Sequence, residues 1–356
     1  MKKIALILYN LDSGGAEKLA LDYLKLLKND FDLEVICFRN DGFFKQDFYK
    51  EAKIRVLTKN IFQYALFRFI PRYQKYLINK IQKEANYDVV VGYMEGRATT
   101  IASYVDGARK IGWIHIDTQK YDIGISDEEA LASYKQLDDI VCVSETVKKS
   151  FLNKYGINNN VHVIYNLINE EDILMKCCEK VQKNEVFTFI NVGVMREQKQ
   201  QQRLVQAAKH LKDKGYKFKI QVLGNITEYG KKVIEEAISL DVMDRIDFMD
   251  FQSNPYKYIK QADCFVMSSA FEGYPVSILE ALFLKVPVIT TLVSGVEEML
   301  ENKYGMIVEN NSDALIEGME SILSNDTILK NYSDKLVNYS GNNFSIVEQL
   351  VNLLKK

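Results

Sequence analysis

Residues 269–290 read SAFEGYPVSILEALFLKVPVIT, the end of an apolar strand, a turn with glycine and proline, and then an apolar helix. A strand, turn and helix in this order direct unpaired backbone N–H groups and the positive end of the helix dipole at one place, which suits a phosphate. Glu272 lies in the turn and Glu280 in the first turns of the helix. A carboxylate able to bind hydroxyl groups therefore flanks the phosphate site on each side, as a nucleotide-sugar pocket requires.

Short β-rich runs alternate with helical patterns along the chain, which is typical of parallel sheets covered by helices. The runs of the first half are KIALILY, LEVICF, IRVL, DVVVGY, KIGWIHI, DIVCVS and VHVIYN. Those of the second half are FTFINVG, FKIQVLG, RIDFMDF, DCFVMSS, VPVITT and MIVE. We expect an α/β fold of two facing, Rossmann-like, doubly wound domains with a central cleft, where ligands bind at the carboxyl ends of the strands.

The domain boundary is expected where this alternation stops. After Asn166 a polar stretch without a strand follows, LINEEDILMKCCEKVQKNE. The predicted N-terminal domain covers residues 1–167, the linker 168–183 and the C-terminal domain 184–343. The closing segment 344–356 is an amphipathic helix that could pack back on the first domain. Two domains also suit 356 residues, because single cores stop growing at roughly 250–300 residues.

The composition excludes several classes of protein. Lys and Arg total 46 against 48 Asp and Glu, so the chain lacks the basic excess of nucleic-acid-binding proteins. The five cysteines form no CxxC pair and three lie in apolar runs, which favours a reduced, cytoplasmic compartment. The apolar run near the N-terminus is too short for a signal peptide core, and none reaches the roughly 18 residues of a transmembrane helix. Any membrane contact, at the inner face, is expected to be peripheral.

Gly14 and Gly15 follow the first strand run and open an amphipathic helix. Paired glycines let a ligand approach the backbone closely. They do not form the GxGxxG fingerprint, which argues against a dinucleotide-dependent oxidoreductase or epimerase. The alternative to an anion site is a plain strand-to-helix turn, and the position at a strand end favours the anion site.

Three further side chains follow strand runs. Lys199 and Arg196 lie in the polar turn MREQKQQQ, where a fixed cation would stabilise the charge of a diphosphate leaving group without a metal. The alternative for both is a solvated surface charge; the position favours function for Lys199 and leaves Arg196 open. His115 ends the run that contains the only tryptophan, Trp113, and is either a contact for a sugar hydroxyl or a structural histidine.

Residues 59–83, KNIFQYALFRFIPRYQKYLINKIQK, contain six Lys or Arg, six aromatic residues and no acidic residue. Basic and aromatic side chains on a helix are typical of a surface that lies on anionic lipid. The alternative is a helix packed on the sheet with solvated lysines.

Asp30, Phe31 and Asp32 match the DxD pattern with which other nucleotide-sugar enzymes hold a divalent metal. The pattern precedes a strand run instead of following one, so we expect a turn at the sheet edge away from the cleft. Because no other carboxylate or histidine cluster has ligand spacing, no metal is expected.

Nine motifs follow one another along the chain, within a stretch from residue 4 to about residue 320 over which the resemblance described next extends: GGAEKLAL, WIHID, VCVSETVKKSF, VIYN, NVG with Lys199, SSAFEGYPVSILEAL, VPVITT, SGVEEML and YGMIV. Together they resemble the family 4 retaining glycosyltransferases of GT-B fold. The resemblance implies that Glu272 contacts the donor sugar near its reacting carbon and that Glu280 binds the ribose hydroxyls. It implies that Lys199 and the backbone of Gly15 bind the diphosphate, and that His115 contacts the donor sugar from the N-terminal, acceptor-binding domain.

The resemblance also implies that backbone N–H groups of the turn hold phosphate and sugar oxygens. The residues of this turn are Gly273, Tyr274, Pro275, Val276 and Ser277. The sequence departs from the family in two places. Val194 stands where the family usually has arginine, so Arg196 is a candidate substitute beside Lys199. LGNITEYG also lacks the family's second glycine, because Asn225 and Ile226 stand there.

The expected activity is therefore that of a metal-independent hexosyltransferase without a cofactor. It would move a hexose or N-acetylhexosamine from a UDP-sugar to a glycan hydroxyl with retention. The expected acceptor is lipid-linked, in surface polysaccharide biosynthesis, with peripheral contact to anionic membrane through residues 59–83. The alternative is a catalytically idle, nucleotide-sugar-binding partner subunit of another glycosyltransferase, which Val194 alone favours.

Overall fold

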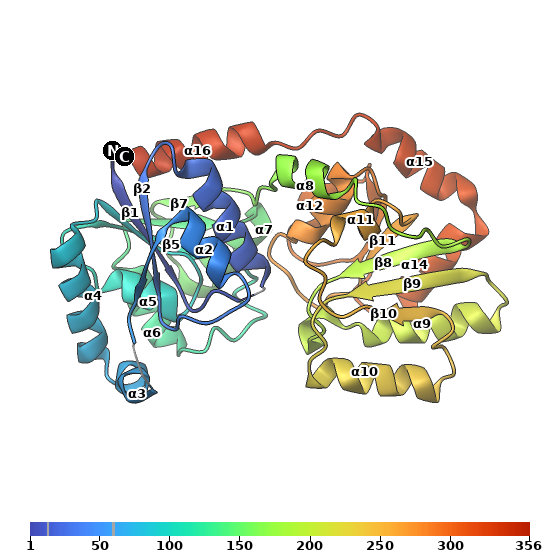
Figure 1. The fold of residues 1–356 in the computed structure, drawn as a ribbon, viewed down its shortest axis with the longest axis horizontal. Helices are drawn as coiled ribbons and strands as arrows, with labels where there is room; N and C mark the ends of the chain where they lie inside the picture. Colours follow the sequence, from blue (N-terminus) through green and yellow to red (C-terminus); the bar gives the residue numbers. More distant parts are fainter. Residues whose placement is uncertain (13, 59–60) are drawn as a thin grey trace. The chain divides into compact units, whose positions relative to one another are not determined.

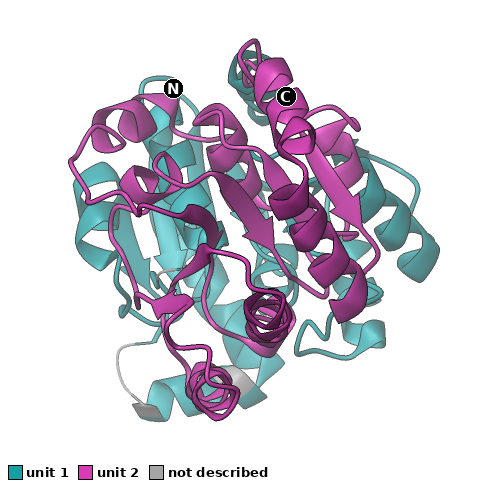
Figure 2. Ribbon diagram, turned by 90° about the vertical axis from the view of Figure 1, so that its right-hand side faces the viewer, with its two compact units in different colours: residues 1–166, 343–356 teal, residues 167–342 magenta. Residues whose placement is uncertain are grey.

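The computed structural model describes residues 1–12, 14–58 and 61–356. It divides into two compact units (Figure 1 and Figure 2). Unit 1 comprises Met1–Asn166 and Asn343–Lys356, and unit 2 comprises Leu167–Asn342. Each is an α/β unit with its own sheet and its own core, as the alternating pattern of strands and helices predicts.

Unit 1 is built on a sheet of seven parallel strands within the described residues, in the order β3-β2-β1-β4-β5-β6-β7. Each strand corresponds to one of the apolar runs in the first half of the sequence. The strands are β1 (Lys3–Leu8), β2 (Asp32–Cys37), β3 (Lys53–Val56), β4 (Val89–Gly92), β5 (Arg109–Ile114), β6 (Asp139–Cys142) and β7 (Val161–Val163).

Helices cover both faces of this sheet (Figure 1). They are α1 (Gly15–Leu27), α2 (Lys45–Glu51), α3 (Ile61–Phe69), α4 (Pro71–Ala85), α5 (Arg97–Ser103), α6 (Asp127–Tyr134), α7 (Glu145–Tyr155) and α16 (Asn343–Lys355). Successive side chains of β1 point to opposite faces of the sheet. Ala5 and Ile7 belong to the core that includes residues of α4 and α5, whereas Ile4 and Leu6 line a small apolar pocket with residues of α1 and α16.

Unit 2 has a sheet of six parallel strands in the part of the chain that the structure describes, in the order β10-β9-β8-β11-β12-β13. The strands are β8 (Phe187–Val192), β9 (Phe218–Leu223), β10 (Ile246–Phe248), β11 (Cys264–Met267), β12 (Val288–Thr291) and β13 (Gly305–Val308). The helices are α8 (Glu170–Lys176), the 3₁₀ turn η1 (Glu197–Lys199), α9 (Gln202–Asp213), α10 (Glu228–Ser239), α11 (Tyr256–Ile259), α12 (Val276–Phe283), α13 (Val296–Leu300), α14 (Ser312–Ser324) and α15 (Asp326–Leu336).

The two cores of unit 2 lie on opposite faces of its sheet. Phe189 of β8 packs in the core formed with α9, α10 and α14. The next residue, Ile190, packs in the core formed with α8, α11, α12 and α13. Successive side chains of a strand point to opposite faces, so one buried strand joins both cores.

The segment 168–183, expected as a linker, belongs to unit 2. It contains α8, which the Asn169 side chain caps by accepting a hydrogen bond from the N–H group of Asp172. Ile173 is fully buried in the core of unit 2, and Asn254 donates to the carbonyl of Lys176 at 3.0 Å. Because this stretch is rich in polar residues, the sequence did not predict the short amphipathic helix that the structure shows. The last helix, α16, groups with unit 1.

The strand order of each sheet reverses once, between β1 and β4 in unit 1 and between β8 and β11 in unit 2. In parallel sheets all carboxyl ends share one edge, and at such a switch point the neighbouring connections diverge and leave room for a ligand. The loops that follow β1 and β4 therefore come together in unit 1. Those that follow β8 and β11 come together in unit 2.

The DxD pattern lies at the opposite edge. Asp32 is the first residue of β2 and is exposed, so it stands at the amino end of the strand. Among the described residues no group of three or more His, Cys, Asp and Glu could hold a metal ion.

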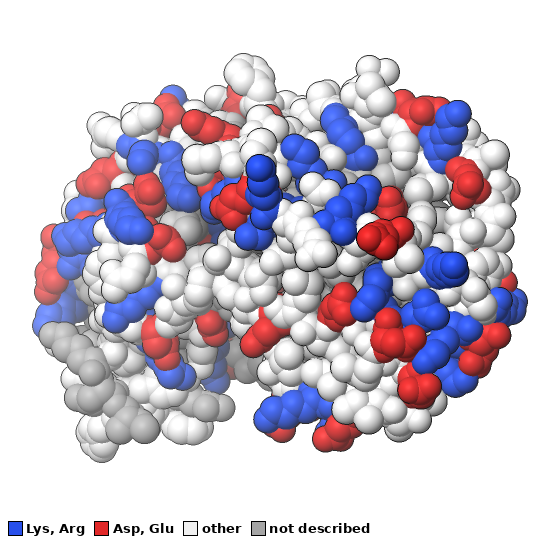
Figure 3. Space-filling model, turned by 45° about the vertical axis from the view of Figure 1, so that its right-hand side comes forward, with Lys and Arg blue, Asp and Glu red and all other residues white. Residues whose placement is uncertain are grey.

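The surface carries charges of both signs. Acidic and basic side chains are interspersed over the face drawn in Figure 3, in line with the formal charge of −2. In the described ranges, no helix combines the length and the hydropathy needed to cross a membrane.

Glu34 in β2 is a buried carboxylate held by four donors. Lys3 Nζ lies 3.1 Å and Lys53 Nζ 3.2 Å from Oε1, while Arg55 Nε at 2.7 Å and the Tyr87 hydroxyl at 2.6 Å donate to Oε2. Burial alone would raise the pKa of Glu34, but the four hydrogen bonds outweigh it and lower this pKa to about 2.

We expect the stabilisation by Glu34 to depend on pH. Because its folded pKa lies below the ordinary value of 4.5, the ionised carboxylate stabilises the fold fully above about pH 4.5, and this contribution is lost as the pH falls toward 2. Glu34→Gln should lower the free energy of unfolding at pH 7 by an amount on the order of 1–3 kcal/mol. Urea unfolding of both proteins at pH 7 and at pH 3 should show the difference shrinking at the lower pH. A constant difference contradicts the assignment, and Glu235→Gln, at an exposed position of α10, is the control.

Candidate functional site

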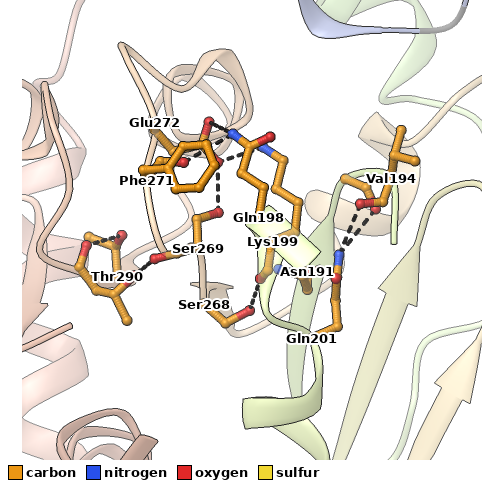
Figure 4. A network of polar contacts seen from close by, with 12 residues as sticks. Asn191, Val194, Gln198, Lys199, Gln201, Ser268, Ser269, Phe271, Glu272 and Thr290 are labelled. Carbon is orange, nitrogen blue, oxygen red and sulfur yellow. Dashed lines mark hydrogen bonds and ion pairs between the residues drawn. The ribbon is translucent and has the colours of Figure 1, made fainter. Parts of the chain in front are cut away.

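Lys199 and Glu272 form an ion pair at the switch point of unit 2 (Figure 4). The distance from Lys199 Nζ to Glu272 Oε1 is 2.6 Å. Lys199 ends η1 in the loop after β8, and Glu272 lies in the loop after β11. The lysine side chain is 25% exposed and that of the glutamate 10%, so water screens the pair little. The structure thus brings together the two residues that the sequence predicted for one site.

Two more side chains hold the carboxylate of Glu272 (Figure 4). Ser269 Oγ donates to Oε1 at 2.6 Å. Gln198 Nε2 donates to the carbonyl of Phe271 at 3.0 Å and makes a long contact of 3.5 Å with Oε2. Oε1 therefore accepts two short hydrogen bonds, whereas Oε2 has the capacity to accept one from a ligand hydroxyl.

Hydrogen bonds also connect the two loops around the pair. The N–H group of Ala270 donates to the carbonyl of Gln198 at 2.8 Å, and Ser268 Oγ donates to the carbonyl of Lys199 at 2.7 Å. Arg203 of α9 donates to the Ser268 carbonyl at 3.1 Å and to Asn310 Oδ1 at 2.8 Å. Burial lowers the pKa of Arg203. Sequence reasoning missed Gln198, Ser269 and Arg203, for which proximity to Lys199 and Glu272 along the chain was the only signal.

The turn of residues 273–277 leads into α12 as predicted. Pro275 is the N-cap residue, with φ −69°, and α12 begins at Val276. The first N–H groups of a helix have no carbonyl partner within it, so those of Val276 and Ser277 are oriented for an anion. Glu280 follows in the second turn, is 5% exposed and accepts a hydrogen bond from the Tyr256 hydroxyl at 3.1 Å.

The two basic residues of the loop after β8, Lys199 and Arg196, have different surroundings. The Lys199 side chain lies over Gly193, where a Cβ atom would be 3.5 Å from Lys199 Cε. Arg196 is exposed, and in the described parts of the chain its side chain forms no ion pair. Only its backbone carbonyl takes part in the turn, accepting from the N–H group of Lys199 at 2.8 Å. The structure therefore does not place Arg196 in the network around Glu272.

In unit 1, Gly14 and Gly15 stand where the sequence predicted, after β1 at the start of α1. Gly14 is the N-cap residue of α1. A Cβ atom built on Gly15 would meet no atom within 4 Å, so the backbone there borders open space. This geometry permits a ligand to approach the backbone, and it also suits a plain turn.

His115 follows β5 and is half-buried. Its ring stacks on Trp113, with centroids 6.1 Å apart and planes at 10°, and packs against Tyr93 at 4.8 Å. Removal from water lowers the pKa of His115 to about 4, so the imidazole is neutral at pH 7. Its Nε2 atom is buried and has no hydrogen-bond partner among the described residues. The imidazole can therefore make one hydrogen bond to a ligand.

Two family descriptions match consecutive parts of the chain. Residues 13–172 match the model of "Glycosyltransferase Family 4". Residues 178–341 match that of "Glycosyl transferases group 1". The two matches together span both units.

Individual relatives are similar over much of the chain. An uncharacterized glycosyltransferase of Methanocaldococcus jannaschii is 26% identical over 237 residues, which is 61% of this chain and 58% of that protein. The N-acetylgalactosamine-N,N'-diacetylbacillosaminyl-diphospho-undecaprenol 4-alpha-N-acetylgalactosaminyltransferase of Campylobacter jejuni is 23% identical and covers 94% of both chains. An Anabaena protein in complex with UDP and glucose has the same fold, with a TM-score of 0.81 and 18% identity over the whole of both chains.

Gly295 tests how tightly the turn at Gly273 is packed. Gly295, with φ +81°, and Gly215, with φ +82°, both have backbones that cost an alanine roughly 1–2 kcal/mol. A Cβ atom on Gly295 would lie 2.6 Å from the Gly273 carbonyl oxygen and 2.8 Å from Tyr274 Cδ2, whereas one on Gly215 would meet nothing within 4 Å. We expect Gly295→Ala to lower the free energy of urea unfolding by about 1–3 kcal/mol more than Gly215→Ala. Equal losses would show that the turn yields easily.

Proposed function

Because this chain belongs to the family 4 glycosyltransferases and has their GT-B fold of two Rossmann-like domains, we propose that it transfers a hexose or N-acetylhexosamine from a UDP-sugar to a hydroxyl group of a glycan acceptor. The anomeric configuration of the sugar is retained. The observation that carries this proposal is the Lys199–Glu272 pair at the switch point, beside the N-terminal end of α12.

Lys199 and the N-terminal end of α12 stabilise the charge that develops on the diphosphate as its bond to the sugar breaks. A lysine ammonium has three N–H donors, so Lys199 can bind a phosphate oxygen while it keeps its bond to Glu272. With this positive charge in place, the reaction needs no metal. The leaving phosphate oxygen then accepts the proton of the acceptor hydroxyl on the same face of the sugar, which accounts for retention.

Glu272 acts by positioning the donor sugar. Its Oε1 is bound by Lys199 and Ser269, which reduces the nucleophilicity of the carboxylate and fixes its orientation. Its Oε2 binds a sugar hydroxyl near the reacting carbon. Glu280 binds the ribose hydroxyls, and the neutral imidazole of His115 binds a further hydroxyl of the sugar.

The relatives support the choice of donor and acceptor. The Anabaena structure of the same fold contains UDP and glucose, which supports a uridine nucleotide. The Campylobacter relative is named for transfer to an undecaprenol-linked glycan, which supports a lipid-linked acceptor in surface polysaccharide biosynthesis. A catalytically idle partner subunit is less well supported, because the Methanocaldococcus and Campylobacter relatives are named as transferases and the lysine and glutamate form an ordered pair.

The same proposal includes a contact with anionic membrane through α4. Gln74 and Ile78 on its inner face are buried. On its outer face a shallow depression is lined by Arg72, Lys75, Tyr76, Asn79, Lys80, Lys83 and Glu84. Phe69, just before α4, is 75% exposed. The helix thus packs on the sheet and still presents basic and aromatic side chains, which suit anionic headgroups. Residues 59 and 60 of the predicted segment lie outside the described residues.

Loss of either member of the pair should reduce turnover without unfolding the protein. We expect Lys199→Ala and Glu272→Gln each to lower kcat for transfer from a labelled UDP-sugar by roughly 10²–10³-fold, because each removes a preorganised charge at the reacting groups. Circular dichroism and the melting temperature should stay close to wild type. The anomeric proton of the product, observed by NMR, reports retention, and EDTA should not change the rate.

Lys214→Ala is the matched control, because Lys214 caps the C-terminal end of α9, the end away from Lys199, and forms an ion pair with Glu320 at 2.7 Å. Near wild-type transfer by both site variants would refute the assigned roles. A thermal-shift comparison of UDP-, GDP- and ADP-sugars tests the base, since ligand binding to the folded state raises its melting temperature. If only a GDP-sugar or an ADP-sugar raised the melting temperature, the proposed donor would carry that nucleotide and not uridine diphosphate.

Binding to membranes should depend on the lysines of α4. We expect the protein to sediment with phosphatidylcholine vesicles only when phosphatidylglycerol is included. Each lysine near such a surface contributes roughly 1 kcal/mol, so the triple variant Lys75→Gln, Lys80→Gln, Lys83→Gln should bind about two orders of magnitude more weakly.

The control for this experiment is a triple variant that removes the same charge from unit 2, namely Lys209→Gln, Lys214→Gln and Lys231→Gln. It should sediment like the wild type. Equal weakening by both triple variants would assign the binding to net charge instead of to α4.

A further inference from the structure

Glu95 in unit 1 directly contacts the loop that carries His115. It follows β4, while His115 follows the neighbouring strand β5. Glu95 Oε2 accepts a hydrogen bond from the backbone N–H group of His115 at 2.9 Å. Because β4 is next to β1 at the switch point, this contact lies at the ligand-binding edge of the sheet.

Glu95 has an environment that a structural carboxylate rarely has. Burial raises its pKa, and among the described residues no lysine or arginine forms an ion pair with it. Glu34, by contrast, is almost fully buried and is bound by three cations, whereas Glu95 is half-buried. Partial removal of a carboxyl group from water without a cation lowers stability. The following residue is also constrained: Gly96 has φ +76°, and a Cβ atom there would lie 2.4 Å from the carbonyl oxygen of Ile123.

The two halves of His115 are thus held from different sides. Glu95 binds its backbone N–H group, while the rings of Tyr93 and Trp113 fix the plane of the imidazole. The one polar atom of the ring that remains without a protein partner in the described structure is Nε2. Both restraints therefore act on the direction in which Nε2 can bond.

We propose that Glu95 is a positioning residue, whose carboxylate fixes the backbone of His115 so that Nε2 is presented to the donor sugar. This inference rests on the proposed function, which gives His115 its contact with the sugar. The hydrogen bond requires an acceptor oxygen at this place and no negative charge. An amide oxygen should therefore replace the carboxylate, whereas a role in proton transfer would require the carboxylate itself.

The test compares Glu95→Ala, Glu95→Gln, His115→Ala and the double variant Glu95→Ala/His115→Ala. For each, kcat and KM for the UDP-sugar are measured together with hydrogen exchange of the His115 amide. We expect Glu95→Ala to lower kcat/KM tenfold or more and to accelerate exchange of that amide. Glu95→Gln should recover most of the activity and the slow exchange. In the His115→Ala background, Glu95→Ala should cost less than a further twofold, because the two residues act through one contact.

Several outcomes would overturn the inference. If the loss of kcat/KM in the double variant equalled the product of the losses in the two single variants, Glu95 would act independently of His115. A Glu95→Gln variant as slow as Glu95→Ala would assign Glu95 to proton transfer. Unchanged hydrogen exchange of the His115 amide in Glu95→Ala would exclude the positioning contact, and this measurement does not require activity. A wild-type protein that transfers no sugar would refute the proposed function instead. Glu34→Gln, which changes a buried carboxylate at the other end of the sheet, should leave kcat/KM unchanged.

Discussion

Parallel strands impose the constraint on which both units depend. Because every strand of a sheet runs in the same direction, all carboxyl ends lie at one edge. Each connection must then bring the chain back to the opposite edge, usually through a helix that covers one face of the sheet. At the two positions where strand order reverses, neighbouring connections leave in opposite directions. The loops after these strands therefore meet without a helix packed across them. In unit 2 this edge joins Lys199 to Glu272, which are 73 residues apart.

A charged pair at such an edge has an energetic cost that its neighbours offset. Removing an ammonium and a carboxylate from water is unfavourable unless hydrogen bonds satisfy both. Ser269 and Gln198 supply additional donors to Glu272, and backbone hydrogen bonds tie the loops of β8 and β11 together. The cation and the carboxylate are consequently oriented before any ligand arrives, so the proposed transfer requires little reorganisation when charge develops on the diphosphate.

Local sequence patterns were sufficient for the strands and for the turn at Gly273, because alternation, glycine and proline act within a few residues. They failed for the segment around Ile173, where polar residues concealed a helix that packs in unit 2. The hydrogen bond from Gln198 to the Phe271 carbonyl joins segments that only the fold brings together, and so does that from the His115 N–H group to Glu95. For Arg196 the sequence suggested a place in the site that the structure does not show. Its position in the loop after β8 favoured the site, yet its side chain is exposed.

The grouping of α16 with unit 1 has a consequence for biosynthesis. Leu350 and Leu354 of this helix close the apolar pocket formed by Ile4 and Leu6 of β1. Along the chain, the whole of unit 2 lies between these two parts of one core. The nascent first unit therefore keeps an apolar groove uncovered until unit 2 has been synthesised and α16 follows it.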